Sequence, residues 1–239
     1  MAKPREKFKT YGDVFDNFTV RLLFKLSSQG HFVEDSLSPL FIGKESNVFT
    51  AMTEEKTKVV IKIYRLETCD FNRMYEYIRL DPRFEGMARR RRMVVFTWAK
   101  REYRNLLKLR ESIRVPTPIA CDQNILIMEM IGTDSPAPKL KDVALEDPQL
   151  MFDKVIASLK KMYFAGYVHG DLSEFNILVW DGEPVFIDFS QTMPSDANQA
   201  DEFFARDVRN LCRFFKKHRI QTDPEQLILS IMNDAKRKA

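Results

Sequence analysis

Four polar residues have the types and the spacing that phosphoryl transfer requires. His169, Asp171 and Asn176 form the pattern H-x-D-x-x-x-x-N, and Asp188 follows in the stretch Ile-Asp-Phe. An aspartate can orient an attacking hydroxyl or accept its proton, while asparagine and aspartate oxygens are ligands that Mg²⁺ prefers. In the alternative interpretation His169 and Asp171 merely cap a turn, but that interpretation does not predict Asn176 or Asp188.

Short apolar runs on either side are expected to position these four residues. Residues 177–179 and 185–187 are rich in Ile, Leu, Val and Phe, and Asp181-Gly182 lies between them as a turn signal. The pattern predicts a hairpin of two buried strands. Such a hairpin would hold His169, Asp171 and Asn176 at its entry and Asp188 at its exit, so that two carboxylates and an amide share one pocket.

A candidate phosphate turn lies earlier in the chain. The stretch 41–49 predicts a strand, a tight turn at Gly43 and a second strand. A glycine lets the backbone approach a phosphate closely, and Lys44 and Ser46 could contact phosphate oxygens. The stretch has one glycine where a kinase glycine-rich loop has three, and it is not a Walker A sequence. An ordinary hairpin remains the alternative.

A lysine and a glutamate complete a second candidate group. Lys62 is embedded in the predicted strand 58–64, and Glu102 lies near the middle of the predicted helix 96–110. The Val-Ile-Lys order is close to the kinase strand whose lysine bridges nucleotide phosphates and pairs with a helical glutamate. The alternatives are a lysine that points to solvent by strand alternation and a surface glutamate that pairs with neighbouring cations.

The long connection between that strand and that helix, residues 65–95, is unusual. A connection of this length is typically functional or disordered, and we expect at least part of it to be mobile. It ends near Arg89–Arg92, four adjacent like charges that favour an extended chain until a polyanion binds. The alternatives for this run are a solvated face and a contact with RNA.

The remaining periodicity predicts an α+β chain. Helices are expected at 13–30, 140–145, 148–166, 201–218 and from 223 onward, and strands at 119–122 and 124–132. Asp13 is the predicted N-cap of the first helix and Gly30 its stop. Gly132 and the Pro136-Ala-Pro138 stretch indicate a change of lobe after the last of these strands.

The composition of the chain limits the class of protein and its location in the cell. The 239 residues are 44% apolar and 30% charged, with a formal net charge of +4, which is ordinary for a globular protein. No apolar run reaches the ~18 residues of a membrane span, and the N-terminus lacks an apolar signal core. The three cysteines and three histidines are scattered, so disulfides and structural zinc are not expected. A cytoplasmic protein with no membrane partner is the prediction.

Taken together, the motifs resemble the RIO family of atypical serine kinases. The residues that match are Gly-Lys-Glu-Ser-Asn-Val (43–48), Val-Ile-Lys-Ile-Tyr (60–64), His-Gly-Asp-Leu-Ser-Glu-Phe-Asn (169–176), Ile-Asp-Phe-Ser-Gln (187–191) and Arg-Asp-Val-Arg-Asn (206–210). The resemblance covers roughly residues 13–220. It suggests an archaeal member of the subfamily that has no winged-helix DNA-binding domain.

The resemblance implies a two-lobed protein-kinase-like fold with a truncated C-lobe. The expected divisions are an N-terminal helical extension packed on the kinase (1–39), an N-lobe with a sheet and one helix (40–131, with the insertion at 65–95) and a C-lobe with the catalytic loop and metal site (132–239). The segment after Asp188 contains no A-P-E motif and a helix is expected soon afterwards. This favours a slow ATPase or a self-phosphorylating switch over a broad peptide kinase.

The resemblance also implies a role for each matching residue. Lys62 and Glu102 would form the phosphate-anchoring ion pair, and Lys44 and Ser46 would line the phosphate turn. The remaining implied roles are hinge backbone contacts to adenine from Glu129 and Ile131, a catalytic Asp171, and metal ligation by Asn176 and Asp188. The implied cofactors are ATP and Mg²⁺, with Mn²⁺ as an alternative metal.

In this family the counterpart of Asp188 can accept phosphate as an acyl-phosphate, and the family acts in late maturation of the small ribosomal subunit. Partners would then be the pre-ribosomal small subunit and its rRNA, with contact through Arg89, Arg90, Arg91 and Arg92 as a hypothesis.

Two departures from the family pattern stand out. Phe41-Ile42 replaces the small polar Ser-Thr pair that usually precedes Gly-Lys-Glu, and the 65–95 insertion contains no serine to match the family's autophosphorylation site. Two alternative functions also stay open. One is a small-molecule phosphotransferase of the aminoglycoside or choline kinase type, and the other is a non-catalytic assembly factor that binds ATP or RNA.

Overall fold

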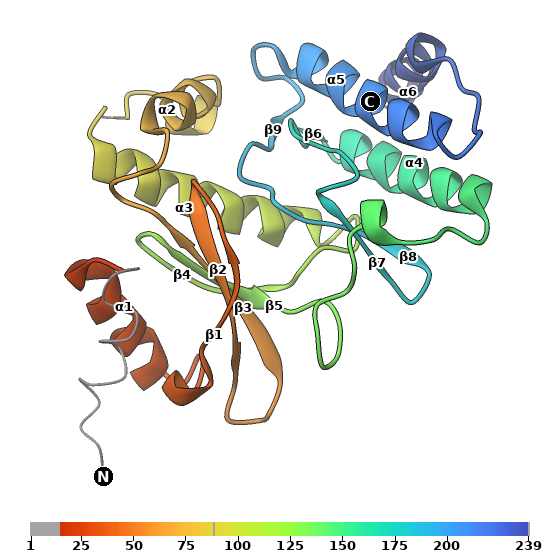
Figure 1. Cartoon of the computed structure of the whole chain (residues 1–239). Helices are drawn as coiled ribbons and strands as arrows, with labels where there is room; N and C mark the ends of the chain where they lie inside the picture. The colour runs from red at the N-terminus through yellow and green to blue at the C-terminus, as the bar shows by residue number, and fades with distance from the viewer. Residues whose placement is uncertain (1–14, 88, 239) are drawn as a thin grey trace.

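The computed structural model describes residues 15–87 and 89–238. One half of the molecule is built on an antiparallel five-stranded sheet in the order β1-β2-β3-β5-β4 (Figure 1). Its strands are β1 (Ser38–Ile42), β2 (Ser46–Met52), β3 (Lys58–Tyr64), β4 (Pro118–Asp122) and β5 (Ile125–Glu129). The predicted strand–turn–strand at 41–49 is therefore the β1–β2 hairpin, in which Gly43 N donates to Ser46 O over 3.0 Å.

Two helices cover the two faces of this sheet (Figure 1). Strand alternation along β3 turns Ile61 and Ile63 toward α1 (Asn17–Ser28), whose Leu23 and Leu26 join the same apolar cluster. The alternate residues of β3 face α3 (Arg91–Leu109). Alternation does not send Lys62 to solvent, because the α3 side of the sheet is also covered.

The start of α1 differs from the expected one. Asp16 caps the helix by accepting a hydrogen bond from Thr19 N at 2.9 Å. The predicted cap Asp13 lies outside the described residues. At the other end Gly30 adopts a φ of +81°, the left-handed conformation in which a glycine stop is favourable. A short η2 (Glu34–Ser36) then leads into β1.

The 65–95 insertion contains a helix that the sequence analysis did not predict. This helix, α2 (Phe71–Arg79), buries Met74 and Ile78 against the first turns of α3, and η3 (Pro82–Phe84) follows it. Helix α3 itself begins at Arg91 instead of Phe96, because Val94 and Val95 are buried in that contact.

The arginine run is also folded where we expected an extended chain. Arg89 lies over Tyr75 with 5.3 Å between the guanidinium carbon and the ring centroid, and Arg92 lies over Phe18 at the same separation. Arg91 contacts Phe71. Stacking on aromatic faces offsets the repulsion between adjacent guanidinium groups.

The other half of the molecule is mostly helical. It contains η4 (Leu140–Asp142), α4 (Pro148–Phe164), α5 (Ala200–Lys216) and α6 (Pro224–Lys238), with the hairpin β7 (Ile177–Trp180) and β8 (Glu183–Phe186) and the short pair β6 (Tyr167–Val168) and β9 (Met193–Pro194). The turn residues Asp181 and Gly182 both have positive φ, as the Asp-Gly signal predicts. Among the described residues no helix is long and apolar enough to cross a membrane.

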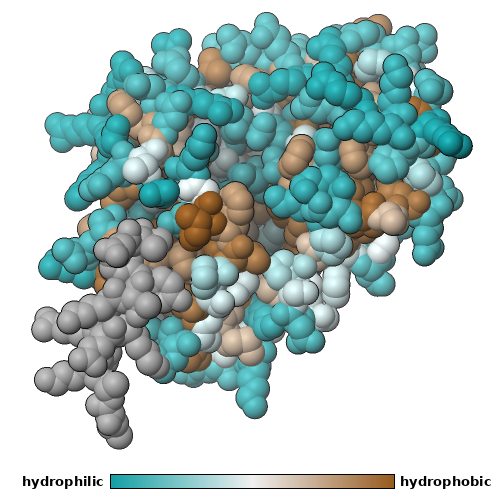
Figure 2. All heavy atoms as spheres, in the orientation of Figure 1, coloured by the Kyte–Doolittle hydropathy of each residue, from teal (hydrophilic) through white to brown (hydrophobic). Residues whose placement is uncertain are grey.

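The surface differs between the two halves. Leu40, Phe41 and Ile42 of the edge strand β1 are exposed, and Figure 2 shows apolar surface gathered over the sheet on this face. The surface over α5 and α6 is mainly hydrophilic in the same view. The connection from β5 to η4 joins the two halves, and the residues singled out for chemistry meet beside it.

Candidate functional site

An ion-pair chain links the two halves of the molecule. Lys62 Nζ on β3 donates to Glu102 Oε1 on α3 at 3.0 Å and to Asp188 Oδ1 at 2.8 Å. Lys62 and Glu102 are 7% and 1% exposed, whereas 39% of the Asp188 side chain is exposed. The lysine is therefore fixed between a buried acid and an acid that faces the solvent.

Charge compensation keeps this group ionised. Burial alone would lower the pKa of Lys62, but Asp188 and Glu102 raise it above its ordinary value. Burial alone would likewise raise the pKa of Asp188, but the Lys62 ammonium and hydrogen bonds from Lys62 and Ser190 lower it to about 2. Asp188 is thus a carboxylate at neutral pH, and its backbone has a φ of +65°, a strained value for a residue other than glycine.

Helix α5 holds the loop that contains Asp171. The buried Asp207 accepts hydrogen bonds from Gly170 N and Leu172 N, both at 2.8 Å, and Arg206 donates to Gly170 O. Burial raises the pKa of Asp207 to about 7 against the effect of these bonds. No role was predicted for Asp207 from the sequence. The signal that could have identified this residue is the Arg-Asp-Val-Arg-Asn motif at 206–210, which contains it.

Within that loop the side chains of Asp171 and Asn176 lie close together. Asn176 Nδ2 donates to Asp171 O at 2.8 Å and lies 3.4 Å from Asp171 Oδ2. Burial and the nearby Asp188 raise the pKa of Asp171, while Arg206 and Arg73 of α2 oppose that rise. Arg73 is a second residue that the sequence analysis missed.

His169 is a buried part of the scaffold. Its Nε2 donates to Ile187 O at 3.1 Å, and its main-chain oxygen accepts from Thr192 Oγ1 at the same distance. Burial lowers the pKa of His169 to about 4, so the ring is neutral at pH 7. The histidine thus links the start of the Asp171 loop to Ile187, the residue before Asp188, and to Thr192, and it does not line the cavity between the two halves.

A cavity of about 400 Å³ opens between the two halves. Most of the residues predicted for nucleotide and metal binding line it, namely Ser46, Lys62, Glu102, Glu129, Ile131, Asn176 and Asp188. Apolar side chains such as Val60, Met128 and Leu178 give it walls suited to a planar ring. Lys44 is exposed and Asp171 is half-buried, and neither is among the lining residues.

The two residues predicted to contact adenine, Glu129 and Ile131, would do so through their main chains and not through their side chains. The Glu129 carboxylate turns away to accept from both terminal nitrogens of Arg114 and from Thr117 N. Ile131 O accepts from Ala137 N at 2.8 Å. Glu129 is the last residue of β5, Ile131 lies in the connection that follows it, and both residues line the cavity. A backbone contact to a nucleobase would form at this wall of the cavity.

The donor set fits a Mg²⁺ ion that is shared with a nucleotide. Asn176 and Asp188 line the same cavity and offer an amide and a carboxylate oxygen. In the described part of the chain no group of three or more His, Cys, Asp or Glu residues could hold a metal on its own. Mg²⁺ typically uses one or two such oxygens, with phosphate and water completing the shell.

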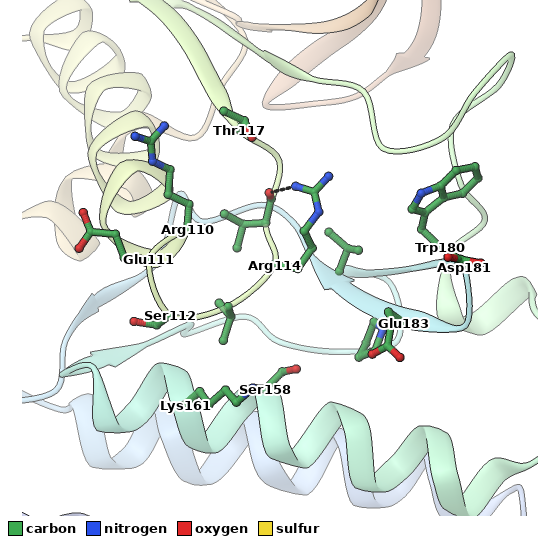
Figure 3. Close-up of a pocket in the computed structure, with 14 residues that line it drawn as sticks. Arg110, Glu111, Ser112, Arg114, Thr117, Ser158, Lys161, Trp180, Asp181 and Glu183 are labelled. Atoms are coloured by element: carbon green, nitrogen blue, oxygen red, sulfur yellow. Dashed lines mark hydrogen bonds between the residues drawn. The ribbon is translucent and has the colours of Figure 1, made fainter.

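A larger cavity of about 790 Å³ lies elsewhere and contains none of the predicted residues. Figure 3 shows it between the end of α3, helix α4 and the β7–β8 turn, with Arg110, Arg114, Lys161 and Trp180 around it. Its cations are matched by Glu111, Asp181 and Glu183. Size alone would select this larger cavity, but the smaller one contains the lysine, carboxylate and amide groups that the motifs singled out.

Comparisons with known proteins agree with this geometry. Residues 47–227 match the RIO domain family. The RIO-type serine/threonine-protein kinase Rio1 of Haloferax volcanii is 38% identical over 97% of this chain and 80% of its own length. The Rio1 of Methanocaldococcus jannaschii is 41% identical over 93% of this chain and 77% of its own length.

A solved structure shows the same fold. The Rio2 kinase–ADP/Mg²⁺–phosphoaspartate complex from Chaetomium thermophilum superposes with a TM-score of 0.66 at 24% identity. The match covers 90% of this chain but only 64% of the Rio2 chain, less than two thirds of it. The α+β, two-lobed kinase-like fold expected from the motifs is thereby confirmed.

Proposed function

The chain belongs to the RIO family of serine/threonine-protein kinases, and on that premise we propose that it transfers the γ-phosphate of ATP at the site formed by Lys62, Asp171, Asn176 and Asp188. The observation that supports this most is the Lys62 ammonium between Glu102 and Asp188, in the cavity that Asn176 also lines. A buried lysine with two acids on one side of an open cleft can anchor phosphate oxygens there.

The proposed roles follow from position. The adenine of ATP lies against the Glu129–Ile131 backbone, and the phosphates of ATP extend past Ser46 to Lys62. Asn176 and Asp188 would hold Mg²⁺, with Mn²⁺ as the alternative, and a metal bound there would neutralise charge that develops on the phosphate. Lys44 lies in the turn between β1 and β2 and is exposed, so its role in the phosphate turn stays a proposal.

Asp171 is the proposed base for a hydroxyl acceptor. Its carboxylate takes the hydroxyl proton as the new P–O bond forms and the bond to the β–γ bridging oxygen breaks, so that ADP leaves. In a second course the free carboxylate oxygen of Asp188 attacks the γ-phosphorus as the bond to the β–γ bridging oxygen breaks and ADP leaves. Water then hydrolyses the resulting aspartyl phosphate to the free carboxylate and inorganic phosphate. The related Rio2 structure contains a phosphoaspartate, which supports this course.

The biological setting is part of the same proposal. We assign residues 1–39, 40–131 and 132–239 to a helical extension, a nucleotide-binding lobe and a catalytic lobe of a cytoplasmic protein. Its partner would be the pre-ribosomal small subunit, with Arg89–Arg92 on rRNA. The supporting observation is that all four arginines are exposed, while Arg89 and Arg92 also stack on aromatic rings of α2 and α1.

Labelling with γ-labelled ATP and Mg²⁺ tests the proposal. We expect protein-bound label that hydroxylamine releases, as an acyl-phosphate on Asp188 does, and that Asp188→Asn abolishes. Acid-stable, hydroxylamine-resistant label would instead assign the transfer to a Ser or Thr side chain. Asp181→Asn is the matched control, because Asp181 is an exposed turn residue with a φ of +53° that asparagine tolerates. If the protein gained no label and released no free phosphate, that result would contradict phosphoryl transfer.

A further inference from the structure

Helix α5 presents a row of cations that leads away from the catalytic loop. Arg206, Arg209, Arg213 and Lys216 recur at steps of three and four residues, so they share one face of the helix, and we call them the α5 stripe. From Arg206 to Lys216 the stripe spans about 15 Å. Arg209, Arg213 and Lys216 are exposed, and Figure 2 shows a hydrophilic surface over this helix.

The near end of the stripe touches the catalytic loop directly. Arg206 donates to Gly170 O, the residue before Asp171, and Asn210 Nδ2 donates to Leu172 O at 3.2 Å. Helix α5 therefore holds the loop and displays the stripe on the same side of the molecule. An extended chain that lies along the stripe would therefore lead toward the loop that contains Asp171, where we expect it to present a side-chain hydroxyl.

The far end of the stripe opens into a cavity of about 370 Å³ between α5 and α6. Arg209, Arg213 and Lys216 line it together with Cys212, Ile220 and Pro224. Glu225 neutralises one of the three cations through a pair with Arg209 at 2.7 and 3.0 Å. The side chains of Arg213 and Lys216 are left to face the cavity as the net positive charge of its lining.

We propose that the α5 stripe binds an acidic segment of the polypeptide that accepts the phosphate. Acidic side chains on one face of an extended chain recur about every 6–7 Å, close to the about 5–6 Å between neighbouring cations on one helix face. The apolar part of the cavity lining takes an aliphatic side chain of the same segment. The inference deepens the proposed kinase activity and rests on it.

The lining chemistry favours a polypeptide over single-stranded RNA. Proteins that bind single strands stack bases on aromatic side chains, and no aromatic residue lines this cavity among the described residues. Three of the four aromatic residues of α5 are buried in the core, namely Phe204, Phe214 and Phe215. Phe203 is half-buried beneath the Arg206 guanidinium at 4.8 Å.

The test compares two serine peptides that differ only in the residues flanking the serine, four glutamates in one and four glutamines in the other. Transfer from γ-labelled ATP gives kcat/KM for each peptide. We expect about a fivefold to tenfold preference for the glutamate peptide in low salt, which a few exposed ion pairs can supply. The preference should shrink in 0.5 M salt, where the Debye length is only about 4 Å.

Charge reversal then locates the effect. Arg213→Glu with Lys216→Glu should remove or invert the preference, and Arg213→Lys with Lys216→Arg should retain it. The matched control is Arg104→Glu with Lys108→Glu, an exposed pair at the same type of spacing on α3, which should leave the preference unchanged. Equal transfer to both peptides, or a preference that survives charge reversal, would overturn the inference.

Two further outcomes separate this inference from the proposed function. ATP turnover with no transfer to either peptide would overturn the acidic-segment inference while the ATP site stands. No turnover of any kind would contradict the proposed function, and the inference would fall with it. Loss of binding to a labelled RNA 20-mer in the charge-reversed protein, with the peptide preference intact, would assign the stripe to RNA instead.

Discussion

At the scale of single residues, the account depends on how burial and charge set the protonation of a few acids. Asp188 is held as a carboxylate by Lys62 and Ser190, whereas burial and the charge of Asp188 raise the pKa of Asp171. The pKa values of these two neighbouring acids are thus shifted in opposite directions. This separation suits the roles that we propose, Asp188 as an ionised metal ligand and Asp171 as a base.

A first prediction concerns Arg73, whose charge lowers the pKa of Asp171. Arg73→Gln removes that charge, so the pKa of Asp171 should rise. As the pH is lowered, Asp171 should then become protonated, and stop acting as a base, at a higher pH than in the wild type. The acid limb of the kcat–pH profile should therefore shift upward relative to wild type. Arg79→Gln on the same helix is the control, because Arg79 pairs with the exposed Glu76. An unshifted or downward-shifted limb would remove Arg73 from the site.

A second prediction concerns His169, whose pKa burial lowers to about 4 from 6.5. The folded protein binds this proton less tightly than the unfolded chain, so the free energy of unfolding should fall as pH drops below about 6.5. Between pH 8 and pH 5 the expected loss is about 2 kcal/mol. Urea unfolding at both pH values measures it. In His169→Gln the loss should be smaller by about that amount, and an equal loss would show that His169 is not its source.

At the scale of elements, the 65–95 insertion is linked through α3 to the segment that follows Asp188. Asp81, in the turn before η3, pairs with Arg101 at 3.3 Å, and both side chains are 0% exposed. Arg101 in turn donates to Gln191 O and Thr192 O, and the neighbouring Asn105 donates to Phe189 O and Thr192 O. The insertion thereby reaches the segment that follows Asp188.

A third prediction tests this connection. Asp81→Asn leaves the Arg101 guanidinium buried without its carboxylate, so unfolding should become easier by about 3–5 kcal/mol. The rate of phosphoryl transfer should also fall, because the 189–192 segment loses a fixed support. Glu76→Gln, an exposed change in the same insertion, should alter neither quantity. A stable and fully active Asp81→Asn protein would mean that the insertion does not position the site.

These elements also show what the sequence alone could and could not predict. Periodicity found β3 and its position at 58–64, and the apolar pattern found the β7–β8 hairpin, since local residue types determine both. Helix α2 was missed because its short apolar set becomes meaningful only against Val94 and Val95 of α3. The site residues could be singled out by motif, but the network of Asp81, Arg101 and Asn105 joins distant segments and leaves no local pattern.

At the scale of the whole molecule, the site exists where two differently built halves meet. The sheet supplies Lys62, the helical half supplies Asp188, and their hydrogen bond crosses the cleft. Basic surface also lies in two places, at Arg89–Arg92 beside α2 and on the α5 stripe. If both proposals hold, separate basic surfaces would allow the molecule to bind a large polyanionic partner and its phosphate acceptor independently.

A fourth prediction belongs to this scale. Changing Arg89, Arg90, Arg91 and Arg92 to serine should weaken binding of a ribosomal RNA fragment and flatten its salt dependence by about 0.7 logarithmic units per lost phosphate contact. The change should also destabilise the fold, because the stacking on Tyr75 and Phe18 is lost. Fluorescence anisotropy across a salt series gives the slope. A slope equal to that of wild type would exclude the arginine run from the RNA contact.

The most direct test of the central claim is a comparison of single-turnover phosphoryl transfer with ATP affinity in Asp171→Asn. Asp171 lies outside the cavity that would hold the nucleotide, so its contribution belongs to the transition state. We predict a transfer rate lower by about 10²–10⁴-fold with a Kd for ATP close to that of wild type. A wild-type rate, or a loss of rate that equals the loss of affinity, would contradict the assignment of this site as the place of phosphoryl transfer.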